Sequence, residues 1–172
     1  ERETRARCIR PDRGKCHDGR IEWWNEVVEG GNAFPQTGPL SFDEARGFLA
    51  AQALTVVAVV DGERFGLYIR HPNNVGRCAH VANASYAVVS SAGGLGLGRE
   101  LVKDSIEQAA KRGFRGLQFN AVVASNASAI HLYEDLGFTR VGTIPGGFCG
   151  NMGGYEDMHI YYRDVVDTGG PC

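Results

Sequence analysis

The chain has 172 residues, of which 43% are hydrophobic and 22% charged, and its formal net charge is -2. This size and composition are typical of one globular domain with a buried core. The charge balance lacks the basic excess of a nucleic-acid surface, and no apolar run approaches the roughly 20 residues that cross a bilayer. We therefore expect a single domain over 1–172, with an N-terminal part at 1–53, a core at 54–164 and a tail at 165–172.

Cysteine usage indicates neither a disulfide framework nor a zinc site. The cysteines are odd in number, widely scattered and never in CxxC spacing. The chain opens without a signal-peptide pattern. We therefore expect a cytoplasmic protein with no metal, no membrane and no nucleic-acid partner. The residues concerned are Cys8, Cys16, Cys78, Cys149 and Cys172.

In the first part of the chain, short local signals predict strands at 6–10, 54–60 and 65–70 and helices at 21–28 and 41–52. Ser41 with Glu44 three residues later is a capping box that begins a helix. Asp61-Gly62 between two β-branched runs predicts a tight hairpin. His71-Pro72 is expected to end the returning strand.

The second part predicts strands at 79–89, 117–123, 138–144 and 155–162, separated by helices and by glycine-rich loops. The helix that follows residue 96 has one apolar face and one charged face, and a second helix is expected at 127–136. Alternation of strands and helices predicts an α/β fold with a partly parallel sheet, to which the hairpin adds antiparallel strands. The apolar face comprises Leu97, Leu101, Val102, Ile106, Ala109 and Ala110.

The sequence GGLGLGR at 93–99 lies between an expected strand and an expected helix. Backbone N–H groups at such a junction, together with the helix dipole, suit a pyrophosphate. A Walker A loop is excluded, because Arg99-Glu100 stands where Lys-Ser/Thr is needed. The fingerprint GxGxxG cannot be placed, because its last glycine would fall on Arg99 or Leu101. The alternative is a flexible turn with a solvated arginine.

A second pattern follows about 30 residues later: Asn126-x-x-Ala129-x-x-x-Tyr133-x-x-x-Gly137-Phe138. The two segments, in this order, resemble motifs A and B of the GNAT N-acetyltransferases. The resemblance implies the GNAT fold, a mixed and mostly antiparallel sheet with a central splayed parallel pair and helices on both faces. Gly93 stands where that family usually has Arg or Gln. This departure removes a side chain that helps to hold the pyrophosphate.

The resemblance also implies the activity, which is direct transfer of acetyl from acetyl-CoA to an amine of a small molecule. Tyr133 would protonate the coenzyme sulfur. A strand bulge at Val88 or Val89 would supply a backbone N–H to the thioester carbonyl. Asn126 would contact the pantetheine arm, cap the following helix, or do both. The pyrophosphate would be bound by Gly94, Leu95, Gly96, Leu97, Gly98 and Arg99.

The acceptor is expected to be an amino or imino acid. Asn83 and Asn120 interrupt apolar strands, and buried amides need partners. Their surroundings are similar to those of proline-analogue acetyltransferases, in which such asparagines line the acceptor site, although structural asparagines would give the same pattern. Asp157 is a third expected substrate contact. The general base stays open between an ordered water and the side chains His80, Glu156, Asp157 and His159.

Two other functions remain open at this point. The chain could be a degenerate GNAT domain that binds coenzyme A as a sensor or interaction module, for which Gly93 is the support. It could also acetylate protein N-termini or lysines, although no long acidic run points to a basic peptide. The sequence does not determine the oligomeric state, and a homodimer is one possibility.

Overall fold

The computed structural model describes residues 7–11, 18–30, 38–92, 94–151 and 153–166. Within these ranges, the β-branched runs form strands and the amphipathic segments form helices, as the sequence predicts. The helices are α1 (Asp18–Gly30), α2 (Phe42–Ala50), α3 (Leu97–Lys111) and α4 (Ala127–Asp135). The strands are β1 (Arg7–Pro11), β2 (Leu54–Val60), β3 (Glu63–Pro72), β4 (Val81–Val88), β5 (Gly116–Val123), β6 (Thr139–Cys149) and β7 (Tyr155–Asp164).

The described strands form one sheet in the order β1-β2-β3-β4-β5-β7-β6. Neighbouring strands run antiparallel except β4 and β5, which are parallel and lie in the centre. The predicted fold class, a mixed and mostly antiparallel sheet with a central parallel pair, is confirmed.

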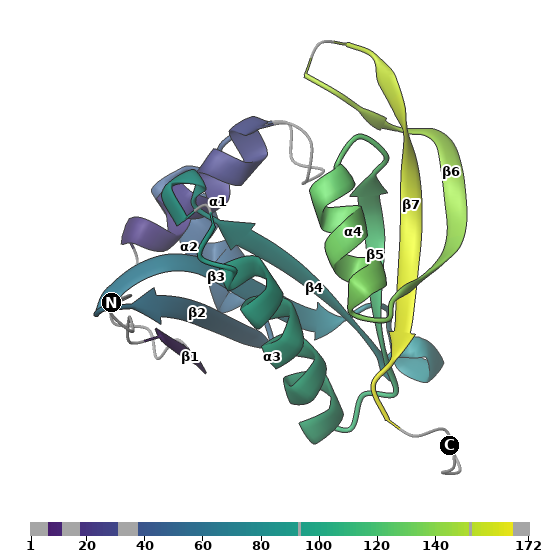
Figure 1. Cartoon of the computed structure of the whole chain (residues 1–172), viewed down its shortest axis with the longest axis horizontal. Coiled ribbons are helices and arrows are strands. Elements are labelled where there is room, and N and C mark those ends of the chain that lie inside the picture. Colours follow the sequence, from purple (N-terminus) through teal and green to yellow (C-terminus); the bar gives the residue numbers. More distant parts are fainter. Residues whose placement is uncertain (1–6, 12–17, 31–37, 93, 152, 167–172) are drawn as a thin grey trace.

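The parallel pair separates soon after it forms. β4 pairs with β5 at Val81–Gly116, Ala82–Leu117 and Asn83–Gln118, and the pairing ends there. Both strands continue, to Val88 and Val123, while they diverge from each other (Figure 1). The backbone groups on the inner edges of the two strands therefore lose their sheet partner over this stretch.

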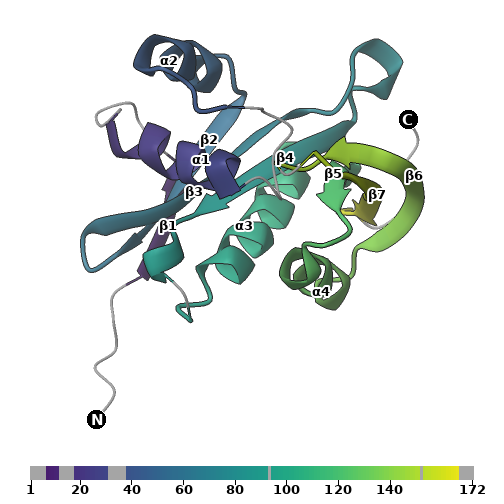
Figure 2. The ribbon, with the colours of Figure 1, turned by 90° about the horizontal axis from the view of Figure 1, so that it is seen from above.

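Helices cover both faces of the sheet: α1 and α2 lie on one face, and α3 and α4 on the other (Figure 2). On the first face, Trp24 of α1 and Leu49 of α2 pack in one cluster with Leu67 and Ile69 of β3. On the second face, Leu101 of α3 packs against the opposite side of the same strands. The sheet is therefore the middle of three layers.

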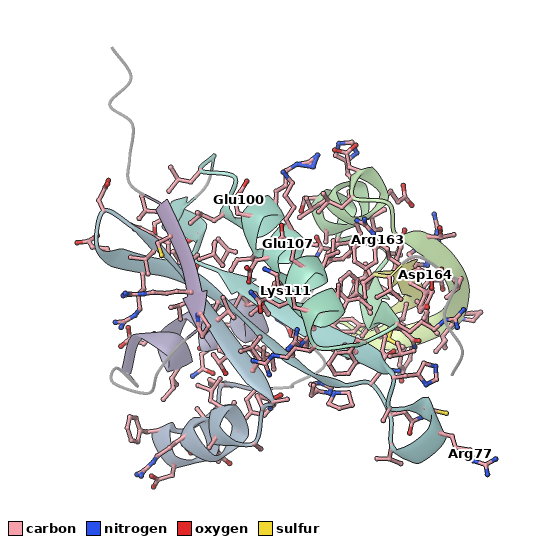
Figure 3. The ribbon with its side chains drawn as sticks, turned by 90° about the horizontal axis from the view of Figure 1, so that it is seen from below. Arg77, Glu100, Glu107, Lys111, Arg163 and Asp164 are labelled. Atoms are coloured by element: carbon pink, nitrogen blue, oxygen red, sulfur yellow. The ribbon has the colours of Figure 1, made fainter. Side chains whose placement is uncertain are left out.

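The local signals in the sequence are reproduced. Ser41 and Glu44 form the predicted capping box at the start of α2. Asp61 and Gly62 have φ values of 51° and 87°, the left-handed values that a two-residue hairpin requires. The apolar face of α3 is buried, whereas Glu100, Glu107 and Lys111 lie on its outer face (Figure 3).

Several strands are longer than predicted, among them β3 and β6. β3 continues through His71 to Pro72, because β4 supplies partners there, with His71 opposite Asn83. Pro72 lies beyond the end of β2, so its missing N–H costs no sheet hydrogen bond. β6 likewise continues to Cys149, through a segment expected to be a glycine-rich loop. β7 supplies its partners, and the register shifts between Ile144 and Phe148.

We expect Gly66→Ala to destabilise the fold by about 1–3 kcal/mol, because a new side chain there meets backbone. A Cβ at Gly66 would lie 2.8 Å from the carbonyl oxygen of Ala87 and 3.3 Å from the Cα of Val88. The free energy of unfolding in urea measures the effect. Gly47→Ala in α2 is the control, since its Cβ meets nothing within 4 Å. That substitution should stabilise by up to about 1 kcal/mol. Equal stability of the two variants would contradict the close approach.

Candidate functional site

A cavity of about 630 Å³ fills the divergence between β4 and β5. Residues from both faces of the sheet line it, because β4 and β5 no longer form a continuous wall there. Odd-numbered residues of β3 and β4 face α1 and α2, and even-numbered residues face α3. The lining from the first face includes Trp24, Phe48, Ile69, His71, Asn83 and Ser85, and the lining from the second includes Tyr86, Leu132 and Tyr133.

The backbone N–H of Val88 points toward the cavity. Val89 donates its N–H to the carbonyl oxygen of Phe65, at 3.0 Å, so odd-numbered residues of β4 bond to β3. Val88 is even-numbered and stands opposite Gly66, so its N–H points away from β3. It faces the side from which β5 has diverged. The β3–β4 register runs from Gly66–Val88 to Pro72–Ala82 without a shift, so the expected bulge is absent from it. The Val88 N–H faces the cavity because successive N–H groups of a strand point to opposite sides, and this requires no bulge.

The glycine loop ends in a helix start that lacks a side-chain cap. Gly94 and Gly96 have φ values of 78° and 71°, and a Cβ at either position would project into open space. Gly96 is the N-cap of α3 and accepts the first helical hydrogen bond, from Glu100. The helix itself therefore offers no acceptor to the N–H groups of Leu97, Gly98 and Arg99. These donors and the helix dipole fit an anion such as a pyrophosphate. Gly93 lies outside the described residues.

Arg99 is held by another helix. Its guanidinium pairs with the carboxylate of Asp135 at the end of α4. Its Nη1 is buried and has no hydrogen-bond partner within the described part of the chain. The side chain thus links the start of α3 to α4 and keeps a donor for a further acceptor.

Tyr133 lies in a cluster of aromatic rings at the edge of the cavity. Its ring centroid is 4.5 Å from that of Phe119 and 5.9 Å from that of Phe138. Burial raises the pKa of the Tyr133 phenol well above its ordinary value. The described residues offer the hydroxyl no hydrogen-bond partner, so it is protonated at neutral pH and available to a ligand.

Asn126 caps α4, as the sequence predicts, because its side-chain oxygen accepts the N–H of Ala129 at 3.3 Å. Ser128 also donates its hydroxyl to this oxygen, at 3.2 Å. Asn126 lines the same cavity as Tyr133. One residue thus begins the helix that carries Tyr133 and borders the space beside it.

The two expected acceptor asparagines converge on a third, Asn73. The Nδ2 atoms of Asn83 and Asn120 both donate to the Oδ1 of Asn73, at 3.1 and 2.6 Å. Gln118 donates to the Oδ1 of Asn120 at 2.8 Å. Asn83 is 8% exposed, and both Asn83 and Asn120 line the cavity. Each primary amide has two N–H bonds, so each keeps one beyond its bond to Asn73. Sequence analysis missed Asn73, which follows the end of β3.

The side chains expected to compete as general base lie elsewhere. Of the described residues, His80, Glu156, Asp157 and His159 do not line the cavity. Asp157 accepts the N–H of Gly146 at 3.0 Å within the β6–β7 pair. His71 does line the cavity, although the sequence suggested only that it ends a strand. Its register with Asn83, which brings it there, could not be read from local sequence.

No helix in the described part of the chain combines the length and hydropathy needed to cross a membrane. Among the same described residues, no group of three or more His, Cys, Asp or Glu side chains is arranged to hold a metal ion.

Residues 19–138 match the Acetyltransferase (GNAT) family. The chain belongs to this family. An N-acetyltransferase of Schizosaccharomyces pombe, aca1, is 30% identical over 155 residues, which cover 80% of this chain and 74% of that protein. The structure of a GCN5-related N-acetyltransferase from Kribbella flavida is 34% identical, with a TM-score of 0.87 over 92% of this chain and 98% of the other. The predicted membership of this family is therefore confirmed.

The fold is shared with more distant structures. A phosphinothricin acetyltransferase from Sinorhizobium meliloti, solved in complex with AcCoA, is 20% identical. It superposes with a TM-score of 0.85 over 92% of this chain and 88% of the other. The splayed sheet with helices on both faces is thus kept at low sequence identity.

Proposed function

We propose that this GNAT acetyltransferase uses acetyl-CoA to acetylate the amine of a small amino or imino acid. The observation that carries the proposal is the single cavity at the splay. It brings together the Val88 backbone N–H, the Tyr133 hydroxyl and the amides of Asn83 and Asn120. Donor and acceptor molecules that enter from opposite faces of the sheet would meet there.

Bound acetyl-CoA supplies the acetyl group as a thioester. The N–H groups of Gly94 to Arg99 hold its pyrophosphate, and Asn126 contacts the pantetheine arm. The Val88 N–H donates to the thioester carbonyl oxygen and stabilises the negative charge that develops on it. The N–H groups of Leu97, Gly98 and Arg99 have no acceptor within α3, and that of Val88 has none in β5, which supports these roles.

The Tyr133 hydroxyl holds the proton that the departing sulfur needs. Its buried phenol is a suitable acid, because it stays protonated over the whole neutral range. Transfer is direct, and no cysteine among the described residues lines the cavity to serve as an intermediate carrier.

The acceptor is small and carries a carboxylate. No described residue of the lining is Asp or Glu. A polyamine or a lysine side chain would find no countercharge in such a site. The remaining N–H bonds of Asn83 and Asn120 can donate to a carboxylate without adding a cation beside the reacting amine.

We expect Gly98→Glu to weaken coenzyme A binding about fivefold to tenfold relative to Gly98→Gln, because its carboxylate repels the pyrophosphate at the helix start. The same carboxylate should favour the free helix, so the two effects have opposite signs. Calorimetry measures binding, and thermal unfolding measures stability. A Cβ at Gly98 meets only Leu132, at 3.8 Å, and Glu and Gln have nearly the same size, so the comparison isolates the charge. Equal affinities would show that the pyrophosphate lies elsewhere.

We expect Tyr133→Phe to bind acetyl-CoA normally but to turn over on the order of 10²-fold more slowly, because the proton donor is lost. Single-turnover kinetics and calorimetry separate the two quantities. Tyr161→Phe is the matched control, since this buried tyrosine neighbours Tyr133 at 6.2 Å and does not line the cavity. If both variants lose the same activity, Tyr133 supports the cluster and does not donate the proton.

The acceptor is tested by a panel of amino acids, imino acids, their carboxamides, polyamines and peptides, assayed by release of free thiol. We expect amino or imino acids to react best. Asn83→Asp should impair these acceptors far more than their carboxamides, because its charge repels a carboxylate. Preference for amines without a carboxylate would refute the proposed acceptor class. Coenzyme binding without acetylation of any amine would indicate a sensor.

A further inference from the structure

We propose that His71 is the general base that removes the proton from the acceptor's ammonium group. This inference rests on the proposed function and assigns a step that the acceptor chemistry requires. An ammonium has no lone pair, so it must lose a proton before its nitrogen can attack a carbonyl carbon.

The fold places His71 in the acceptor half of the cavity. It stands opposite Asn83 in the β3–β4 ladder, at the position where β4 and β5 cease to pair. Its side chain is on the face covered by α1 and α2, with Trp24 and Phe48 in the same lining. Since Asn83 is the proposed carboxylate contact and stands opposite His71, a bound amino acid would occupy the part of the cavity that His71 borders.

Its hydrogen bond fixes which ring nitrogen can accept a proton. The Nδ1 of His71 lies 2.8 Å from the carbonyl oxygen of Pro72. A carbonyl oxygen can only accept, so Nδ1 carries the hydrogen in the neutral ring. The lone pair is therefore on Nε2, the atom that a base must present.

No other described side chain of the cavity can do this near neutral pH. The remaining titratable groups in the lining are the phenols of Tyr86 and Tyr133, and burial raises the pKa of both. Imidazole is the side chain whose ordinary titration falls in the neutral range.

Neutral side chains from four neighbouring elements line the same cavity as His71. Arg70 precedes His71 in β3 and projects to the opposite face, where its guanidinium lies over the ring of Phe114. No carboxylate among the described residues of the lining faces the imidazole. The four neutral neighbours are Trp24 of α1, Phe48 of α2, Asn83 of β4 and Asn120 of β5.

The proton balance is complete with the groups present. The ammonium gives one proton to the Nε2 of His71, which releases it to solvent. The nitrogen lone pair then forms the C–N bond to the acetyl carbon as the C–S bond breaks. The Tyr133 hydroxyl gives its proton to the departing sulfur, and the second nitrogen proton restores the phenol. One amide, one thiol and one released proton result.

The test compares the pH dependence of kcat/KM for the wild type, for His71→Gln and for His131→Gln, an exposed histidine on α4 outside the lining. We expect His71→Gln to be on the order of 10²-fold slower at pH 7. The deficit should shrink as pH rises above the pKa of the acceptor amine, because the amine is then already neutral. His131→Gln should follow the wild type. A deficit that is constant at every pH would mean a structural role and overturn the proposal.

A second measurement does not depend on turnover. In ¹⁵N-labelled wild-type protein, the His71 ring should show a protonated Nδ1 and an unprotonated Nε2. Its titration should coincide with the acidic limb of the kcat/KM profile. A ring protonated on Nε2, or a titration unrelated to that limb, would overturn the proposal. If the wild type acetylates no amine, the proposed function itself fails, whereas an active wild type with an unaffected His71→Gln refutes this inference alone.

Discussion

The brevity of the contact between β4 and β5 is the constraint on which the rest of the molecule depends. The two strands share hydrogen bonds only from Val81 to Asn83, and both continue for five residues beyond. A central strand that lacks a neighbour on one side leaves polar backbone groups unpaired inside the fold, which is unfavourable unless a ligand or water bonds to them. These unpaired groups lie beside the cavity. The same opening connects the two faces of the sheet.

Helices and side chains keep the opening in place. The ring centroids of Phe119 in β5 and Tyr133 in α4 are 4.5 Å apart, with the rings tilted, and Phe138 stacks on Phe119 at 4.6 Å. On the other side of the cavity Trp24 and Phe48 approach within 5.1 Å. The Arg99–Asp135 pair joins the beginning of α3 to the end of α4. The cavity between β4 and β5 is thus bordered by large aromatic rings, which occupy the space that the strands would need in order to pair.

Sequence analysis succeeded where the relevant neighbours are close along the chain. The capping box at Ser41, the hairpin at Asp61 and the apolar face of α3 each depend on residues within one or two turns. It failed for His71 and Asn73, whose roles depend on partners brought near by sheet register. Asn73 accepts from residues 10 and 47 positions away, a relation without a local pattern. The bulge was expected because of family resemblance, and alternation along β4 achieves the same exposure without it.

That alternation has a consequence for backbone dynamics. The N–H groups of Ser85, Ala87 and Val89 point to β3, whereas those of Tyr86 and Val88 point to the opening. Amide hydrogen exchange along β4 should therefore oscillate with a period of two, slow at one residue and fast at the next. Such a pattern is unusual for the middle of a sheet, where every amide is normally protected. A molecule bound in the cavity between β4 and β5 would slow the exchange of the fast amides. Hydrogen exchange along β4 would therefore show whether the cavity is occupied.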